Sequence, residues 1–296
     1  LEARGHTGRQ AWIALFDEYR KQYPDLTDQV YRMQHRQLPE GWDADLPTFP
    51  GDKKGMAGRD ASGKVLNAIA KRVPWLMGGS ADLAPSTKTR LTFEGTGDLQ
   101  AATPGGRNIH FGVREHAMGA VLNGLSLCKL RPYGSGFLIF SDYARPAIRL
   151  SAIMELPTIH VFTHDSIGVG EDGPTHQPIE HLASLRAIPH LHTIRPADAN
   201  EVTEAWRLIM RLRHEPVALI LSRQALPTLD RTKYASASGL LRGGYVLADA
   251  SADGRERTPQ IILIASGSEV HLAVEAYEQL TAAGIAARVV SLPCWE

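Results

Sequence analysis

Residues 163–178 read T-H-D-S-I-G-V-G-E-D-G-P-T-H-Q-P and follow P-T-I-H-V-F (157–162), a short apolar and β-branched run. A run of this kind next to a proline is typical of a buried strand. In open α/β folds, the loop after such a strand lies at the carboxyl edge of the sheet, where ligands bind. The loop contains two histidines, three acidic residues and three glycines, which permit tight turns and close backbone approach. We therefore expect a binding site here.

Two other interpretations of this loop are open. Imidazole and carboxylate both bind zinc or iron, so His164, His176 and the neighbouring acids could hold a metal. The loop has no compact pair such as H-x-x-x-H, and we therefore expect no metal ligands in this chain. The polar side chains could also simply cap neighbouring backbone groups of a surface turn. The rest of the chain decides between these interpretations.

The overall composition excludes several classes of partner. The 32 Lys and Arg residues balance 32 Asp and Glu residues without a basic block, so we expect neither nucleic acid nor a membrane surface as a partner. No apolar run approaches the ~18 residues of a membrane-spanning helix, and no signal peptide is recognisable. Cys128 and Cys294 both lie in apolar stretches, which suits a reducing compartment without disulfides. A cytoplasmic location is the expectation.

The order of predicted elements indicates an α/β fold with a mostly parallel sheet and helices on both faces. We expect a helical segment and linker at 1–57, an α/β domain at 58–235, and the incomplete start of a second α/β domain at 236–296. Because the chain starts without methionine and stops just after a strand-like run, we expect a piece of a longer polypeptide. Strands are expected at 75–77, 108–111, 157–162, 191–194, 217–221, 245–247, 260–265 and 286–292; helices at 9–23, 26–33, 61–73, 112–128, 198–212 and 268–282; an extended linker at 38–50; and a polar connection at 224–240.

Four residues suggest a slot for a flat, partly polar ligand. Glu115 is expected at the start of a helix, where the helix dipole alone would favour an acid. Phe137, Phe140 and Tyr143 are spaced three apart and would share one helix face, which ordinarily means core packing. Taken together, they could form an apolar slot for a heterocycle with one carboxyl group at its rim.

Three further residues are candidates for binding a phosphate. Arg223 directly follows the predicted strand 217–221, and the fork of an arginine donates two parallel hydrogen bonds to phosphate. Arg59 precedes a helix and Ser86 follows a proline; each of these alone is weaker, because exposed arginines and turn serines are usually only solvated.

Four motifs closely resemble those of the transketolase family of thiamine diphosphate enzymes, in the same order and spacing. They are G-G-S-A-D-L-A-P-S (78–86), H-F-G-V-R-E-H-A-M-G-A (110–120), F-L-I-F-S-D-Y-A-R (137–145) and the loop quoted above (163–178). The resemblance extends over essentially the whole chain. It implies a thiamine diphosphate-binding fold and the reversible transfer of a two-carbon ketol unit from a ketose phosphate to an aldose phosphate, a reaction of the pentose phosphate pathway.

The resemblance also implies roles for individual residues. Glu115 would hydrogen-bond the pyrimidine ring of the cofactor, and His176 would share the catalytic work. Phe140 would stack on that ring, Phe137 and Tyr143 would line its slot, and Asp82 would lie near the thiazolium. The residues implied to hold sugar phosphate are Arg59, Ser86, His164 and Arg223, with Asp172 and His176 at the sugar hydroxyls.

One departure from the family pattern is important. Transketolases bind the diphosphate and its Mg²⁺ through an N-terminal domain with a Gly-Asp-Gly motif, and this sequence has no such triplet; 51–53 (G-D-K) and 97–99 (G-D-L) come nearest. The resemblance therefore implies that the chain supplies the pyrimidine half of a site at the interface of a homodimer, and that it is inactive alone. A dihydroxyacetone synthase-like enzyme and a non-catalytic pyrimidine domain that dimerises or binds a partner remain alternatives.

Overall fold

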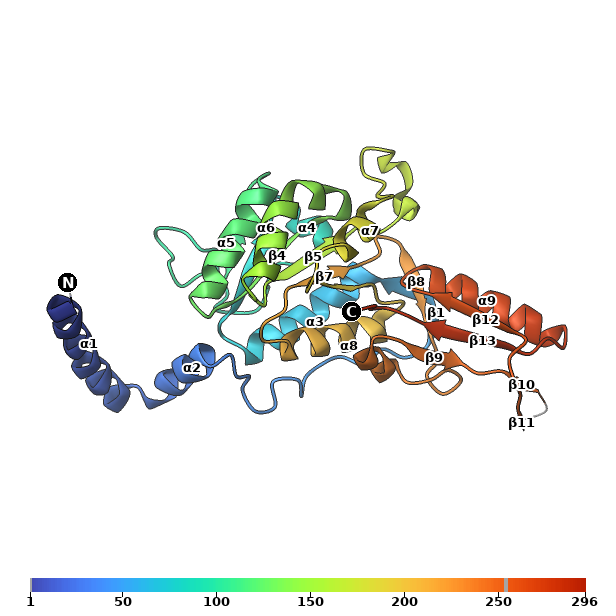
Figure 1. The fold of residues 1–296 in the computed structure, drawn as a ribbon, viewed down its shortest axis with the longest axis horizontal. Helices are drawn as coiled ribbons and strands as arrows, with labels where there is room; N and C mark the ends of the chain where they lie inside the picture. Colours follow the sequence, from blue (N-terminus) through green and yellow to red (C-terminus); the bar gives the residue numbers. More distant parts are fainter. Residues whose placement is uncertain (1, 253–254) are drawn as a thin grey trace.

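The computed structural model describes residues 2–252 and 255–296. At its N-terminal end, helices α1 (Glu2–Gln22) and α2 (Pro24–Gln34) extend away from the body of the molecule (Figure 1). Pro24 begins α2, because proline is accepted in the first turn of a helix but not in its interior. The predicted pair of helices is confirmed.

The linker that follows is extended, as predicted. Residues 37–51, all of which the structure describes, contain no helix or strand. Phe49 fixes the linker to the main body: its N–H donates to Asn200 Oδ1 at 3.0 Å, and its carbonyl accepts from Asn200 Nδ2 at 2.8 Å. The Phe49 ring is buried in the main core.

Among the described residues, six parallel strands form the central sheet, in the order β3-β2-β4-β5-β7-β6. Most of their residues are buried, as expected for a parallel sheet that is covered on both faces. The predicted mostly parallel sheet is confirmed. The strands are β2 (Leu76–Ser80), β3 (Asn108–His110), β4 (Arg131–Phe137), β5 (Ile159–Thr163), β6 (His192–Ile194) and β7 (Val217–Ile220).

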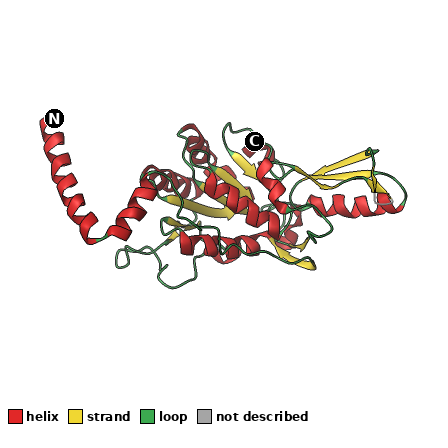
Figure 2. Ribbon diagram, turned by 90° about the horizontal axis from the view of Figure 1, so that it is seen from below, coloured by secondary structure: helices red, strands yellow, loops and turns green. Residues whose placement is uncertain are grey.

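Helices cover both faces of this sheet (Figures 1 and 2). Side chains alternate along a strand, so Val161 faces one layer of helices and its neighbour Phe162 faces the other. The layer on the Val161 side consists of α3 (Gly58–Arg72) and α8 (Ala199–Arg211). The opposite layer consists of α5 (Glu115–Leu127), α6 (Ser141–Ile153) and α7 (His181–Arg186). Shorter helical segments are α4 (Ala84–Thr87), η1 (Leu138–Phe140) and η2 (Ile167–Asp172).

The sequence pattern does not predict two strands outside the central sheet, β1 (Asp52–Ala57) and β8 (Ala225–Thr228). They pair antiparallel, with Met56 opposite Leu226. The interpretation of 224–240 as a polar connection is therefore wrong in its first part. Neither segment alternates apolar and polar residues regularly, so pairing with a distant segment, rather than local pattern, specifies both strands.

A second α/β unit follows, as predicted. Among the described residues after 236, three strands form a sheet in the order β12-β13-β9, with β12 and β13 parallel and β9 antiparallel to β13. Helix α9 packs on this sheet. The elements are η3 (Ala237–Arg242), β9 (Tyr245–Ala248), β10 (Ser251–Ala252), β11 (Arg255–Glu256), β12 (Ile261–Ala265), α9 (Glu269–Ala282) and β13 (Ala287–Ser291).

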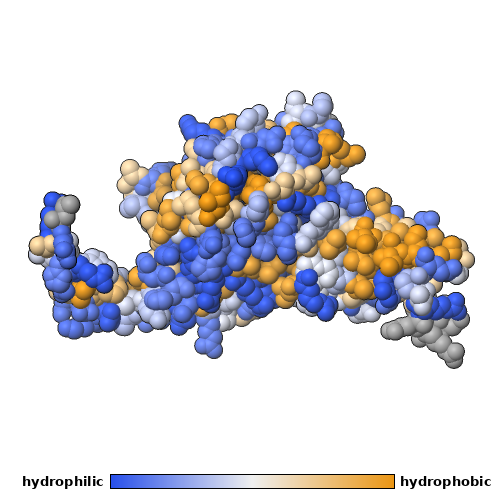
Figure 3. Space-filling model, viewed as in Figure 1, coloured by the Kyte–Doolittle hydropathy of each residue, from blue (hydrophilic) through white to orange (hydrophobic). Residues whose placement is uncertain are grey.

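The other face of this second sheet is exposed and apolar. Leu263 packs beneath α9, whereas Ile262 and Ile264 point the opposite way and are 51% and 63% exposed. Figure 3 shows an apolar surface at the end of the molecule formed by this second unit.

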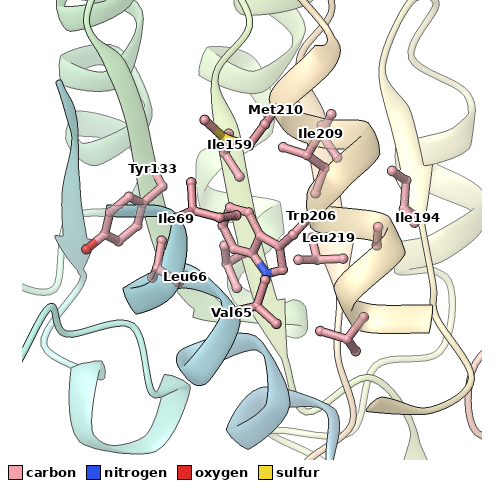
Figure 4. Close-up of a cluster of buried hydrophobic side chains, with 14 of the residues drawn as sticks. Val65, Leu66, Ile69, Tyr133, Ile159, Ile194, Trp206, Ile209, Met210 and Leu219 are labelled. Atoms are coloured by element: carbon pink, nitrogen blue, oxygen red, sulfur yellow. The ribbon is translucent and has the colours of Figure 1, made fainter. Parts of the chain in front are cut away.

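The largest core lies between the central sheet and the layer formed by α3 and α8. Trp206 of α8 is fully buried there against Leu66 and Ile69 of α3 (Figure 4). Its indole N–H donates to Ser62 Oγ at 2.9 Å, so the one polar atom of the ring is satisfied. This core joins α3 to α8 and holds the strands whose carboxyl ends carry the candidate site.

Two further expectations concern the cysteines and membranes. Cys294 is buried, whereas Cys128 is exposed at the end of α5. The last turn of α5 points this residue to solvent beside Leu127, which is itself 55% exposed. Within the described residues, none of the helices has both the length and the hydropathy to cross a bilayer.

Candidate functional site

The candidate site lies at the carboxyl edge of the central sheet. The strand order reverses between β2 and β4, and open α/β folds bind ligands at such a switch point. Asp82 follows β2, Phe137 ends β4, His164 follows β5, and Arg223 follows β7. The parallel topology therefore brings these residues to one edge, although they are far apart in the sequence.

Three aromatic residues form the apolar part of the site, but not in the predicted way. Phe137 ends a strand, Phe140 lies in η1 and Tyr143 lies in α6, so the expectation that they share one helix face is wrong. Strand β4 reads R-P-Y-G-S-G-F. Its proline and two glycines weaken the strand pattern, so the sequence does not predict a strand here. The rings are nevertheless neighbours, with centroids 5.8 Å apart for Phe137–Phe140 and 6.2 Å for Phe140–Tyr143.

Both histidines of the 163–178 loop reach this aromatic cluster. The His164 ring lies 3.7 Å from the Phe137 ring, and the His176 ring lies 5.5 Å from that of Phe140. His164 is only 3% exposed. A surface turn that only caps its own backbone would leave this side chain in water, so the structure favours the binding-site interpretation.

His164 is held in an unusual conformation and remains neutral. Its φ of 61° lies in the left-handed region, which a residue with a side chain rarely adopts. Its Nδ1 lies 2.8 Å from Thr163 Oγ1. Burial, reinforced by the positive charge of Arg59, lowers the pKa of His164 to about 4. At neutral pH the ring therefore has one N–H donor and one acceptor nitrogen.

The predicted phosphate-binding residues come together around His164. Arg59, in the first turn of α3, donates from Nη1 to the backbone carbonyl of Ser86 at 2.9 Å. Arg223 Nε lies 3.5 Å from Asp172 Oδ2, which in turn lies 3.9 Å from His164 Nε2. The charge of Arg59 acts on His164, so the five residues form one group, called the phosphate cluster below after the ligand predicted for it from the sequence.

The charges and free donors of the phosphate cluster suit an anion. The cluster contains two guanidinium groups and one carboxylate, so its net charge is positive when His164 is neutral. Arg59 Nε is buried and has no hydrogen-bond partner among the described residues. An acceptor atom of a bound ligand would satisfy this donor. Phosphate oxygens match a guanidinium fork in geometry and charge.

Glu115 is a largely buried residue whose carboxyl group has no partner. It is the first residue of α5 and only 7% exposed, and no described residue forms a hydrogen bond or an ion pair with it. The helix dipole favours an acid at this position but does not explain its burial. Burying an unpaired carboxyl costs free energy unless a donor meets it, so the position suits a ligand with a polar N–H or ring nitrogen.

Asp82 stands apart from the phosphate cluster. It is exposed, has a φ of 59°, and lines a cavity of about 510 Å³ with Ser80, Arg90 and His110 at the ends of β2 and β3. Within the part of the chain that the structure describes, no hydrogen bond or ion pair joins Asp82 to the other predicted residues.

One group of side chains has the composition of a metal site. Asp142, Glu180 and His181 bring ligand atoms within 4.8 Å of one another. Asp142 Oδ2 lies 3.2 Å from Nε2 of His181, whereas Glu180 Oε2 lies 3.9 Å from Nδ1. Both carboxylates are exposed, and such acidic groups are common without an ion, so the contact between Asp142 and His181 is explained as a hydrogen bond.

Arg195 is a residue of this edge that the sequence interpretation missed. It directly follows β6 and forms an ion pair with Asp165, the neighbour of His164, at 2.8 Å. A sequence signal existed, because an arginine that directly follows a strand is the same signal that identified Arg223.

Comparison with known families gives two matches along the chain. The family model described as the transketolase pyrimidine-binding domain matches residues 54–228, and the model described as the transketolase-like C-terminal domain matches residues 243–296. A transketolase from Halalkalibacterium halodurans is 50% identical over 100% of this chain and 43% of its own length. The chain therefore spans less than half the length of this curated relative.

Solved structures give the same similarity. A Pichia stipitis transketolase in complex with sedoheptulose 7-phosphate superposes with a TM-score of 0.89 and 44% identity, covering 99% of this chain and 43% of that one. A chain described as a split-gene transketolase, in an inactive β4 tetramer, superposes with a TM-score of 0.64 and 30% identity, covering 81% of this chain and 72% of that one.

Proposed function

This chain belongs to the transketolase family, and we propose on that premise that it takes part in the reversible transfer of a two-carbon ketol unit from a ketose phosphate to an aldose phosphate. The observation that carries this proposal is the phosphate cluster, which gathers two arginines, a serine, a histidine and an aspartate beside an aromatic slot. Such a site offers one region for an anion and another for a flat ring. We assign the reaction to the pentose phosphate pathway.

The residues present fit the pyrimidine ring of thiamine diphosphate. Phe140 would stack on the ring, with Phe137 and Tyr143 beside it, because the three rings are neighbours and Tyr143 is itself 64% exposed. The unpartnered carboxyl of Glu115 would meet a nitrogen of the ring and hold a proton there. When bound, the cofactor supplies a nucleophilic carbon and an electron sink.

The phosphate cluster would bind the substrate. Arg59, Ser86, His164 and Arg223 hold the phosphate, and the neutral His164 donates one N–H without adding charge. Asp172 and His176 meet the sugar hydroxyls, where His176 accepts or donates a proton. The sugar-phosphate complex of the Pichia stipitis relative supports this class of substrate.

We propose that another domain holds the diphosphate and Mg²⁺. The sequence contains no Gly-Asp-Gly triplet, and the one carboxylate of the phosphate cluster, Asp172, forms an ion pair with Arg223 at 3.5 Å. Asp82, exposed at the edge of its cavity, would lie near the thiazolium. The division into a helical segment and linker (1–57), a pyrimidine-binding domain (58–235) and a C-terminal unit (236–296) is part of the same proposal.

We further propose a homodimer with the site at the subunit interface, located in the cytoplasm. Exposed apolar side chains at the site end of helices α5 and α6 could be covered by a partner: Val113 just before α5 is 77% exposed, and Tyr143 in the first turn of α6 is 64% exposed. Two free cysteines are compatible with a reducing compartment.

The inactive split-gene tetramer supports the proposal that this chain alone has no catalytic activity. It also favours a non-catalytic pyrimidine domain as the second candidate.

Complementation separates the two candidates. The chain is expressed with the diphosphate-binding domain of the Halalkalibacterium halodurans relative, and ketol transfer from xylulose 5-phosphate to ribose 5-phosphate is measured. A split enzyme gains activity that requires both parts, the cofactor and Mg²⁺. If the two parts associate and bind cofactor but remain inactive, the chain is a non-catalytic module.

A further inference from the structure

Arg195 connects the 163–178 loop to the second α/β unit. The side chain is buried, and its Nε and Nη2 donate to Asp165 Oδ2 at 3.1 and 2.8 Å. On its other side, Nη2 donates to Ser268 Oγ and Glu269 Oε1, both at 3.1 Å, while Nη1 bonds Glu269 Oε2 and the carbonyl of Ser266. One guanidinium therefore joins three segments of the chain.

The second unit is shaped to approach Arg195 closely. Gly267 has a φ of 58°, and its N–H donates to the backbone carbonyl of Arg195 at 3.0 Å. A Cβ at position 267 would lie 2.6 Å from Arg195 Nε, so only glycine allows this approach. Residues 266–269 thus contact Arg195 both through their backbone and through the side chain of Glu269.

Asp165 is adjacent to the residue that needs support. His164 has a positive φ, and a residue with a side chain keeps such a backbone only where its surroundings fix it. Thr163 contacts the ring from one side. Asp165, the next residue in the chain and itself only 4% exposed, is fixed by its pair with Arg195. Without that pair, the buried Asp165 carboxylate would lose its counter-charge and move toward water, together with His164.

We propose that residues 266–269 and Arg195 form a clamp through which the second α/β unit positions His164 for binding the sugar phosphate. This inference rests on the proposed function, which assigns His164 to the phosphate. Arg195, Asp165 and Glu269 are positioning residues, because they act on the substrate only through His164. The second unit would then contribute to substrate binding although none of its residues belongs to the phosphate cluster.

The test compares Glu269→Gln with Glu275→Gln in the full-length protein. Both substitutions remove one negative charge from α9, but Glu275 is exposed and forms no ion pair or hydrogen bond with any described residue. Diethyl pyrocarbonate acylates accessible neutral histidines, and peptide mapping reports each histidine separately. We expect the acylation rate of His164 to rise about 3- to 10-fold in Glu269→Gln, the equivalent of one partly exposed charged contact, and not in Glu275→Gln.

His160 is the internal control for general loosening. It lies in β5, four residues before His164, and is fully buried. A rise at both histidines would mean that the substitution only destabilises the domain, and would overturn the clamp. Arg195→Met removes the central residue of the clamp, and circular dichroism checks that this variant folds. An unchanged acylation rate of His164 in both Glu269→Gln and Arg195→Met would also overturn the clamp.

A kinetic measurement connects the clamp to function. Glu269→Gln should raise KM for sugar phosphates about 3- to 10-fold and leave kcat and the use of unphosphorylated glycolaldehyde nearly unchanged. If acylation of His164 rises but KM does not, the clamp does not serve phosphate binding and the inference fails. A wild-type protein without ketol transfer would refute the proposed function instead, while the acylation result would still decide whether the clamp exists.

Discussion

Replacing Arg223 by glutamine separates substrate binding from cofactor chemistry. Arg223 Nε lies 3.5 Å from Asp172 in the phosphate cluster, and its side chain is 36% exposed. A charge-assisted contact contributes about 1.5–3 kcal/mol, and partial exposure to water moves the expected value to the lower half of that range. Since about 1.4 kcal/mol is a factor of ten, KM for phosphorylated sugars should rise roughly 10- to 30-fold in Arg223→Gln.

The effect should be confined to KM and to phosphorylated substrates. The phosphate is far from the reacting carbon, so its contact with Arg223 is similar in the ground state and the transition state, and kcat should change little. Steady-state kinetics with ribose 5-phosphate and with glycolaldehyde, on the same full-length preparation, measure both predictions. Arg242→Gln, at an exposed position of η3, is the matched control. Equal losses with both acceptors would refute the assignment of Arg223 to the phosphate.

Three further predictions test other parts of the site and core. Glu115→Gln should slow hydrogen–deuterium exchange at the reactive carbon of bound thiamine diphosphate about 10²- to 10⁴-fold without unfolding the protein, as measured by NMR. An unchanged exchange rate would show that Glu115 has no catalytic role and only begins a helix. Phe140→Ala should weaken cofactor binding about tenfold in calorimetric titration, because a stacked ring contributes about 1.5 kcal/mol, whereas an unchanged Kd would remove Phe140 from the slot. Burial lowers the pKa of His160 to about 4, so the unfolded chain, with a histidine pKa near 6.5, binds more protons than the folded chain as pH falls from 6.5 to 4. The free energy of unfolding should therefore drop by about 2 kcal/mol between pH 7 and pH 5 on account of His160, and His160→Gln should remove this part of the drop in urea titrations.

The sequence predicted the elements whose pattern is local. The strand before the 163–178 loop and helix 198–212 carry continuous or periodic apolar residues, and both lie where expected. Strand β4 was missed because Pro132, Gly134 and Gly136 weaken its strand signal, although its neighbours β2 and β5 complete its hydrogen bonds. Strands β1 and β8 form by pairing with each other, which no local pattern encodes.

The candidate site was predictable as a set of residues but not as a geometry. The motifs identified Phe137, Phe140 and Tyr143, yet the assumption of one helix was wrong, because the chain changes from strand to helix between the first and the last of them. The turn from β4 through η1 into α6, rather than one helix face, brings the rings together. Arg195 follows a strand as Arg223 does, but its contacts with Asp165 and Glu269, which are distant in the sequence, appear only in the structure.

Cofactor binding by the chain with and without a diphosphate-binding domain tests the central claim most directly. Calorimetric titration with thiamine diphosphate and Mg²⁺ should give weak binding, in the millimolar range, for the 296-residue chain alone, because several charged contacts of about 1.5–3 kcal/mol each are missing. Addition of the diphosphate-binding domain should give micromolar binding together with ketol transfer. Micromolar binding by the chain alone, or no gain on addition of the second domain, would contradict the claim that this chain provides the pyrimidine half of the site.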